Sequence, residues 1–152
     1  MSSLYETDLV AWAEDQVEAL RRLAAEHPEV AADLDLPNLI DEVESMGVSV
    51  ERELVNRLAV LLLHLAKWQW QPVLRTRSWR NIVDEQRDHM ALILDDNPSL
   101  HRRLPAALAK AWRLGRRKAH RDTGLDLDIF PESCPFTAEQ AMQDEWMPDV
   151  RD

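Results

Sequence analysis

The chain has 152 residues, of which 45% are hydrophobic and 30% are charged, and its formal net charge is -10 at pH 7. This length predicts one domain over residues 1–152 that buries a core without metals or disulfides, and the composition excludes a disordered chain. The single cysteine, Cys134, excludes an internal disulfide and favours a reducing cytoplasm, while the acidic balance argues against general nucleic-acid binding. No secretion signal begins the chain, and the longest nearly apolar stretch, residues 58–66, is shorter than the roughly 20 residues of a membrane span.

Helix-forming residues fill the first half of the chain, with no alternating strand pattern. Thr7 or Asp8 can cap a first helix that runs to about residue 26. A second helix opens near residue 35, and Gly47 marks either a break or a bend before a third segment, which ends at about residue 71. This third segment is apolar on nearly opposite sides, so we expect it to be central and packed by neighbours all round.

The second half continues the helical pattern and then becomes irregular. Ser78 is expected to cap a fourth helix through residue 96, and a fifth helix runs from about 105 to 123, where Gly124 closes it. Beyond it, prolines indicate an irregular arm in which Thr137 can cap a last short helix. The predicted fold is therefore an all-α, single-domain helical bundle of about five helices with an irregular C-terminal arm.

Charge is distributed unevenly along the chain. Residues 1–53 contain 14 acidic and three basic side chains, residues 97–121 contain eight basic and no acidic ones, and residues 122–152 contain nine acidic and one basic. The segment 102–121 is thus a basic helix in an acidic protein, with one basic face that includes Arg113 and Arg117. Such a face is a candidate for pairing with acids of the same chain, for an acidic partner, or for phosphate.

Several separated motifs resemble one family. They are PNLIDEVESMG at 37–47, HLAKWQWQP at 64–72, SWRNIVDEQR at 78–87, NPSL at 97–100 and FPESCPF at 130–136. In this order they resemble the bacterial family catalogued as domain of unknown function 29, over residues 5–146. The resemblance implies a compact all-helical bacterial protein and supplies no activity, substrate or catalytic residue.

His64, Lys67 and Trp68 are a candidate pocket corner, because a histidine near an apolar stripe can titrate near neutrality and an indole offers a flat wall. The alternative is a core histidine that bonds a carboxylate or carbonyl on a neighbouring helix. Glu42 or Glu44 could supply this partner if the second and third segments pack antiparallel.

Metal and nucleophile chemistry find little support in the sequence. No histidine has a glutamate three residues before it, which argues against a di-iron site, and there is no cysteine pair, His-Glu-x-x-His motif or glycine-rich phosphate loop. Glu85 and His89, four residues apart, permit a metal site but more often form a surface pair. Cys134 lacks activating neighbours in sequence and fits a small apolar plug. We predict no catalytic residue, no metal ligand and no cofactor.

The six tryptophans exceed what a core of this size normally needs, so we expect some at the surface, where they mark interfaces. Trp68 and Trp70 point about 200° apart on a regular helix, which makes one of them a candidate for a partner surface. The preferred function is a cytoplasmic interaction or regulatory module without catalysis, which binds a protein partner or itself. Its candidate binding residues are His64, Lys67, Trp68, Trp70, Trp79, Arg113 and Arg117. The alternatives are a small-molecule or metal-dependent enzyme centred on His64, and nucleic-acid binding through the basic helix.

Overall fold

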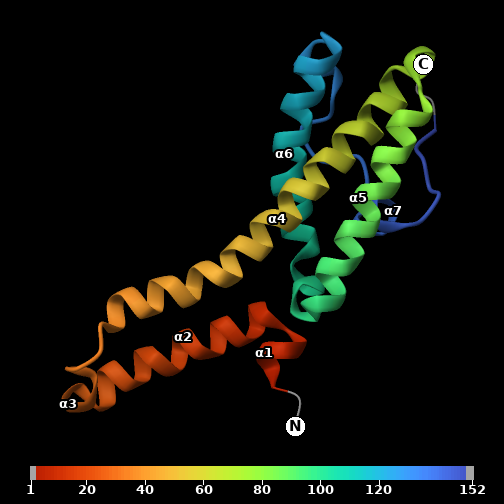
Figure 1. The fold of residues 1–152 in the computed structure, drawn as a ribbon. Coiled ribbons are helices and arrows are strands. Elements are labelled where there is room, and N and C mark those ends of the chain that lie inside the picture. The colour runs from red at the N-terminus through yellow and green to blue at the C-terminus, as the bar shows by residue number, and fades with distance from the viewer. Residues whose placement is uncertain (1–2, 150–152) are drawn as a thin grey trace. The chain divides into compact units, whose positions relative to one another are not determined.

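The computed structural model describes residues 3–149, and within them the chain forms α-helices and short 3-10 helices without strands. The α-helices are α1 (Leu4–Thr7), α2 (Leu9–Glu26), α3 (Pro28–Ala31), α4 (Leu36–Trp70), α5 (Arg77–Asp96), α6 (Leu104–Thr123) and α7 (Ala138–Met142) (Figure 1). The 3-10 helices are η1 (Pro72–Leu74), η2 (Pro98–Arg103) and η3 (Leu127–Ile129). The predicted all-α fold is confirmed. None of the described helices is both long enough and apolar enough to cross a bilayer.

The chain divides into two compact units. Unit 1 contains the described part of residues 1–53 together with 94–101, and unit 2 contains 54–93 together with the described part of 102–152. The prediction of one domain over 1–152 stays a prediction.

In unit 1, α2 and the first part of α4 lie side by side as a helical hairpin (Figure 1). Gly47 faces α2 closely: a Cβ built on it would lie 3.6 Å from the Cβ of Ala13. The buried apolar positions of this hairpin are Val10, Ala13, Val17 and Leu36. Gly47 therefore neither breaks the helix nor separates two helices, and the second and third predicted segments are one helix of 35 residues.

Unit 2 is built around the second part of α4. Leu58, Ala59, Leu61, Leu62, Leu65 and Ala66 are at most 1% exposed, which confirms that this segment is packed on nearly all sides. α6 approaches it closely at Gly115, where a Cβ would lie 3.1 Å from the carbonyl oxygen of Ala59. Small residues of α6 (Ala107, Ala111, Ala119) are buried along the same helix, and they allow the backbones to approach.

The helix ends largely follow the predicted signals. Asp8 caps α2 by accepting a hydrogen bond from the backbone of Ala11, and Thr137 forms a capping box with Gln140 at α7. Gly124 ends α6 in the left-handed conformation, with φ 69°. The prediction for α5 was wrong by two residues: the hydroxyl of Thr76, rather than Ser78, accepts a bond from the backbone of Trp79.

Candidate functional site

His64 lies in the interior of unit 2, 9% exposed. Its Nδ1 is 2.8 Å from the carbonyl oxygen of Val60, one turn earlier in α4, and because a carbonyl only accepts, Nδ1 carries the proton. Burial lowers the pKa of His64, with Lys67 acting in the same direction and the Val60 bond and Asp122 opposing it. His64 is thus a neutral core histidine at neutral pH.

The carboxylates expected to bond His64 are not its recorded partners. The expectation required the segments that contain Glu42 and Glu44 to pack antiparallel to the segment that contains His64. All three residues belong to the continuous helix α4, so this packing does not exist. A carbonyl of its own helix satisfies the imidazole instead.

Lys67 connects α4 with two other elements of unit 2. Its Nζ lies 4.6 Å from the ring centroid of Trp79 on α5 and 3.8 Å from a carboxylate oxygen of Asp122 on α6. The lysine side chain is 15% exposed, so a cation–π contact and an ion pair hold a largely shielded charge. This arrangement neutralises Lys67 within the chain.

Trp68 and Trp70 both have partners in unit 2. The guanidinium of Arg75 lies 4.5 Å from the ring centroid of Trp68 and donates from Nε to the Trp68 carbonyl at 2.8 Å. Trp70 meets Phe130 edge to face, with centroids 5.4 Å apart. Arg75 thereby closes the carboxyl end of α4, and Phe130 fastens the C-terminal arm to it.

None of the six tryptophans is an exposed residue, which differs from the expected surface tryptophans. Trp112 is buried and donates from Nε1 to the carbonyl of Pro131 at 2.9 Å. Trp12 meets Tyr5 edge to face, with centroids 4.9 Å apart. The aromatic excess arises because the arm and the helix ends use indoles as packing partners.

The basic face of α6 is exposed. Lys110, Arg113, Arg117 and Arg121 are all exposed, and within residues 3–149 none of these four forms an ion pair. Leu114, 40% exposed, lies among them. We use the name α6 face for these five residues. The sequence left pairing within the chain open, and the described residues do not supply it.

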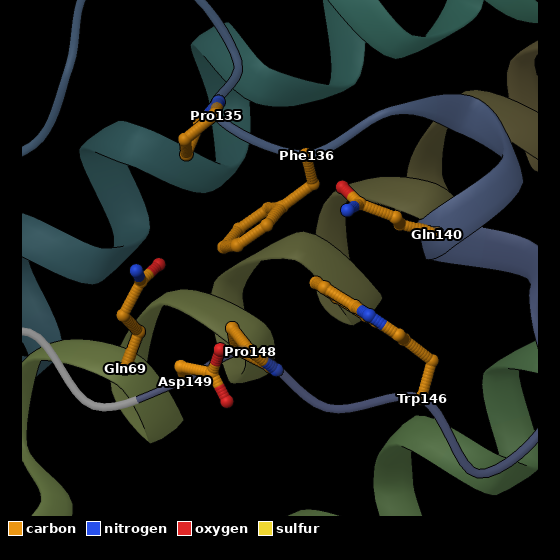
Figure 2. A pocket seen from close by; sticks show the side chains of 7 residues that line it. All are labelled: Gln69, Pro135, Phe136, Gln140, Trp146, Pro148 and Asp149. Carbon is orange, nitrogen blue, oxygen red and sulfur yellow. The ribbon is translucent and has the colours of Figure 1, made fainter.

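A cavity of about 350 Å³ lies between α4 and the C-terminal arm of unit 2. Its lining residues are Gln69, Pro135, Phe136, Gln140, Trp146, Pro148 and Asp149, and we call it the arm pocket. Figure 2 shows the rings of Phe136 and Trp146 next to each other at the pocket, with the amide of Gln69 directed toward Phe136. The two rings are 6.0 Å apart between centroids.

Gln69 is the unusual member of the arm pocket. It is 5% exposed, and its Oε1 is buried without a hydrogen-bond partner among residues 3–149. Leaving a buried acceptor unbonded costs about 1–3 kcal/mol, so such groups are rare in native structures. Gln69 therefore brings an unbonded acceptor to the wall of the pocket.

Arg87 on α5 holds the arm around this pocket. It is 2% exposed and donates to the carbonyls of Ala141 at 2.9 Å, Gln140 at 3.2 Å and Trp146 at 2.8 Å. Burial lowers the pKa of Arg87, and Asp84 and Asp144 oppose this shift. The guanidinium thus works as a structural clamp on α7 and on the backbone of Trp146.

The backbone just before Trp146 is also constrained. Glu145 has φ 64°, the left-handed region that side chains other than glycine rarely adopt. Such conformations cost on the order of 1 kcal/mol and persist where the surroundings enforce them. Here a turn holds it, in which the backbone N–H of Trp146 donates to the carbonyl of Gln143 at 3.2 Å, and the Arg87 bond to the Trp146 carbonyl fastens the end of this turn at the pocket.

The described residues offer no cluster for metal binding and no activated nucleophile at Cys134. Within the described residues, no group of three or more His, Cys, Asp or Glu is placed to hold a metal. Glu85 and His89 form a surface pair at 3.9 Å. Cys134 is half-buried, and burial raises the pKa of its thiol, although a backbone bond from Phe136 opposes the shift. This direction is opposite to that of an activated thiolate.

The fold and these sites define a small all-helical protein whose described surface offers a basic helix face and one aromatic-lined pocket. The chain belongs to the family described as Domain of unknown function DUF29, whose model matches residues 4–147. It is similar to the crystal structure of an alpha-helical protein of unknown function from Rhodospirillum rubrum, with a TM-score of 0.72 and 22% identity. The match covers 96% of this chain and 93% of that chain, and at this identity it shows the fold alone. A comparison with curated proteins gave no match.

Proposed function

We propose that this protein is an interaction module without catalytic activity, and that its α6 face binds the acidic surface of unit 1 on a second copy of the chain. The single observation that carries the proposal is the row of cations on α6 that have no ion-pair partner among residues 3–149. Unneutralised charges of one sign on one helix face favour a partner of the opposite sign.

The chain itself contains the complementary charge. Residues 1–53 carry 14 acidic and three basic side chains. Exposed apolar residues occur there as well, including Leu39 at 42% and Met46 at 36%. On the α6 face, Leu114 lies among the cations and supplies the matching apolar contact. A surface that mixes carboxylates with apolar side chains therefore fits the α6 face on both counts.

Nucleic acid fits the same face less well. The net charge of -10 repels a polyanion at long range. The α6 face contains no aromatic side chain that could stack on a base, and Leu114 gains nothing from a phosphate backbone. The half-buried Trp68, Trp70 and Trp79 are engaged within unit 2, so the proposal rests on α6 rather than on tryptophan.

The test is sedimentation velocity of the full chain at salt concentrations of about 50 and 500 mM, over which the Debye length falls several-fold. We expect reversible association at low salt that is lost at high salt. The double variant R113E/R117E should remain monomeric at both. The matched control R77E/R102E makes the same charge change at exposed positions outside the α6 face, and it should associate like the wild type.

Two results would overturn the proposal. One is a monomeric wild type at low salt and about 100 µM protein, since weak specific pairs associate within this range. The other is equal association by R113E/R117E. In a parallel titration with a short DNA and a short RNA, salt-dependent binding without self-association would assign the α6 face to nucleic acid instead.

A further inference from the structure

We infer that the arm pocket is a binding site for a small organic cation that carries N–H donors, an ammonium or a guanidinium group. The inference does not depend on the α6 face, because other residues of unit 2 line the pocket. A volume of about 350 Å³ is at the lower end of the range of small-molecule pockets, about 300–1,000 Å³.

The first argument is the unbonded acceptor. Gln69 is 95% removed from solvent, and its Oε1 has no hydrogen-bond partner within the described residues. Less than 1 Å² of this oxygen is accessible to solvent, so a guest bonds it after the amide turns toward the pocket. An N–H donor would then satisfy it, whereas a ligand that offers only acceptors would not. Gln140 is already committed in part, since its Oε1 accepts from the backbone of Thr137 at 3.1 Å.

The second argument is the pair of aromatic rings. The rings of Phe136 and Trp146 lie next to each other in the wall of the pocket (Figure 2). The two rings contact each other edge to face, with centroids 6.0 Å apart and an interplanar angle of 70°, so a guest lies against this pair rather than between the rings. The faces of aromatic rings attract cations, and tryptophan does so most strongly. Pro135 and Pro148 add apolar walls for the alkyl part of the guest.

The third argument is charge. Among the lining residues that the structure describes, Asp149 contributes the only ionisable side chain. The chain from 122 onward carries nine acidic residues and one basic residue. Behind the pocket, the guanidinium of Arg87 is engaged by three carbonyls and lies near Asp84 and Asp144. The charge that a guest meets is therefore negative, which favours a cation over an anion.

The geometry around Trp146 indicates that the aromatic wall of the pocket is preformed. Glu145 is held with φ 64°, and Arg87 holds the next carbonyl at 2.8 Å. A strained backbone that is fixed by a buried clamp keeps the indole in place before a ligand arrives. This preorganisation reduces the entropy that binding would otherwise lose.

The test is an NMR titration of the full chain with putrescine, with butylammonium and with butyrate as an anionic probe. The reporter is the indole N–H of Trp146, assigned by its absence in Trp146→Phe. We expect saturable shifts with both amines, with dissociation constants on the order of millimolar for probes of this size. Butyrate should give none.

Two variants separate a binding role from a structural one. Gln69→Leu removes the unbonded amide, so the variant should fold at least as stably as the wild type. Its affinity for the amines should nevertheless fall at least fivefold. Asp149→Asn should lower the affinity for the amines by a similar factor. It should leave the free energy of unfolding unchanged, because Asp149 is exposed. The matched control Asp128→Asn changes an exposed carboxylate of the same arm that does not line the pocket, and it should bind amines normally.

The source of the cation is decided by adding blocked lysine and blocked arginine to the titration. Tighter binding of a blocked residue than of putrescine would identify a side chain of a protein, and the reverse order would identify a free amine. The inference is overturned if no cation gives a saturable shift up to about 50 mM, well beyond a millimolar constant. It is also overturned if butyrate binds as well as the amines, or if Gln69→Leu and Asp149→Asn leave amine binding unchanged.

Discussion

The carboxylate of Asp8 binds Ser99 twice, although 91 residues separate them. One oxygen accepts from the backbone N–H of Ser99 at 2.7 Å, and the other accepts from its hydroxyl at 2.9 Å. The same carboxylate caps α2 through Ala11 at 2.9 Å. Asn97 extends the connection by accepting from the backbone of Val10 at 3.2 Å. Unit 1 is thus closed at one end by polar bonds that join the start of α2 to residues 97–99.

Replacing Asp8 by alanine should lower the free energy of unfolding by about 2–4 kcal/mol, because it removes a helix cap and leaves the Ser99 N–H without its acceptor. Asp8→Asn should cost less, since its single carbonyl oxygen can still accept. Urea denaturation measures both. Asp15→Ala, at an exposed position in the middle of α2, serves as the control and should stay within about 0.5 kcal/mol of the wild type. Equal effects at the two positions would contradict the role assigned to Asp8.

The same substitution at two helical glycines should have opposite effects. At Gly47 a new Cβ meets its nearest neighbour at 3.6 Å, an ordinary contact, and at Gly115 it meets the carbonyl oxygen of Ala59 at 3.1 Å. Gly47→Ala should therefore stabilise by about 0.5–1 kcal/mol through helix propensity. Gly115→Ala gains the same propensity but forces two helix backbones apart, at about 1–3 kcal/mol, so the net change should be a loss. Thermal and urea unfolding measure the stability change in both variants. Stabilisation by both substitutions would show that α6 can shift relative to α4.

Much of the fold could be predicted because the helices obey local rules. The ends of α2, α5 and α6 fall within two residues of the positions that caps, prolines and glycine indicated. At Gly47 the sequence left a break or a bend open, since an isolated glycine in a helix is as compatible with close packing as with a break. Only the neighbour across the hairpin, Ala13, distinguishes the two cases. A single sequence does not contain that distance.

The candidate site was much harder to predict. The α6 face could be read from charge periodicity, and Arg113 and Arg117 are exposed as expected. The arm pocket was missed, because most of its lining residues come from an irregular segment in which spacing has no fixed geometric meaning. Gln69, which α4 contributes, lies inside the HLAKWQWQP motif between Trp68 and Trp70, the residues that the sequence predicts at a binding surface. No feature of the neighbouring sequence indicates that an amide oxygen lacks a hydrogen-bond partner.

The clamp formed by Arg87 predicts local release of the arm. Arg87→Gln should lower the free energy of unfolding by about 2–4 kcal/mol, since three carbonyls lose a charged donor that is 2% exposed. Arg87→Lys should be intermediate, because an ammonium cannot reproduce the planar fork. Hydrogen exchange followed by mass spectrometry should show faster exchange at residues 138–148 in both variants. Unchanged exchange there, with the same global loss, would mean that Arg87 supports α5 rather than the arm.

His64 should make the stability of the protein depend on pH. Burial lowers its pKa in the folded chain below the ordinary value of 6.5, so the unfolded chain binds the proton more tightly. The neutral imidazole donates to Val60 from Nδ1, and protonation of Nε2 would place a charge in the core near Lys67. The stabilisation is therefore complete above pH 6.5 and is lost as the pH falls from 6.5 toward the folded pKa, with a slope of at most about 1.4 kcal/mol per pH unit.

His64→Gln isolates this effect, because glutamine can still donate a hydrogen bond but does not titrate. We expect the difference in unfolding free energy between wild type and variant to be constant above about pH 7 and to shift in favour of the variant below pH 6.5, where only the wild type acquires a buried charge. Urea denaturation at intervals between pH 5 and 8 measures it, and carboxylate titration cancels in the difference. Parallel curves over the whole range would mean that solvent or a rearranged Asp122 accommodates the imidazolium. An opposite slope would mean that His64 is charged in the folded protein, which would return it to consideration as a functional group.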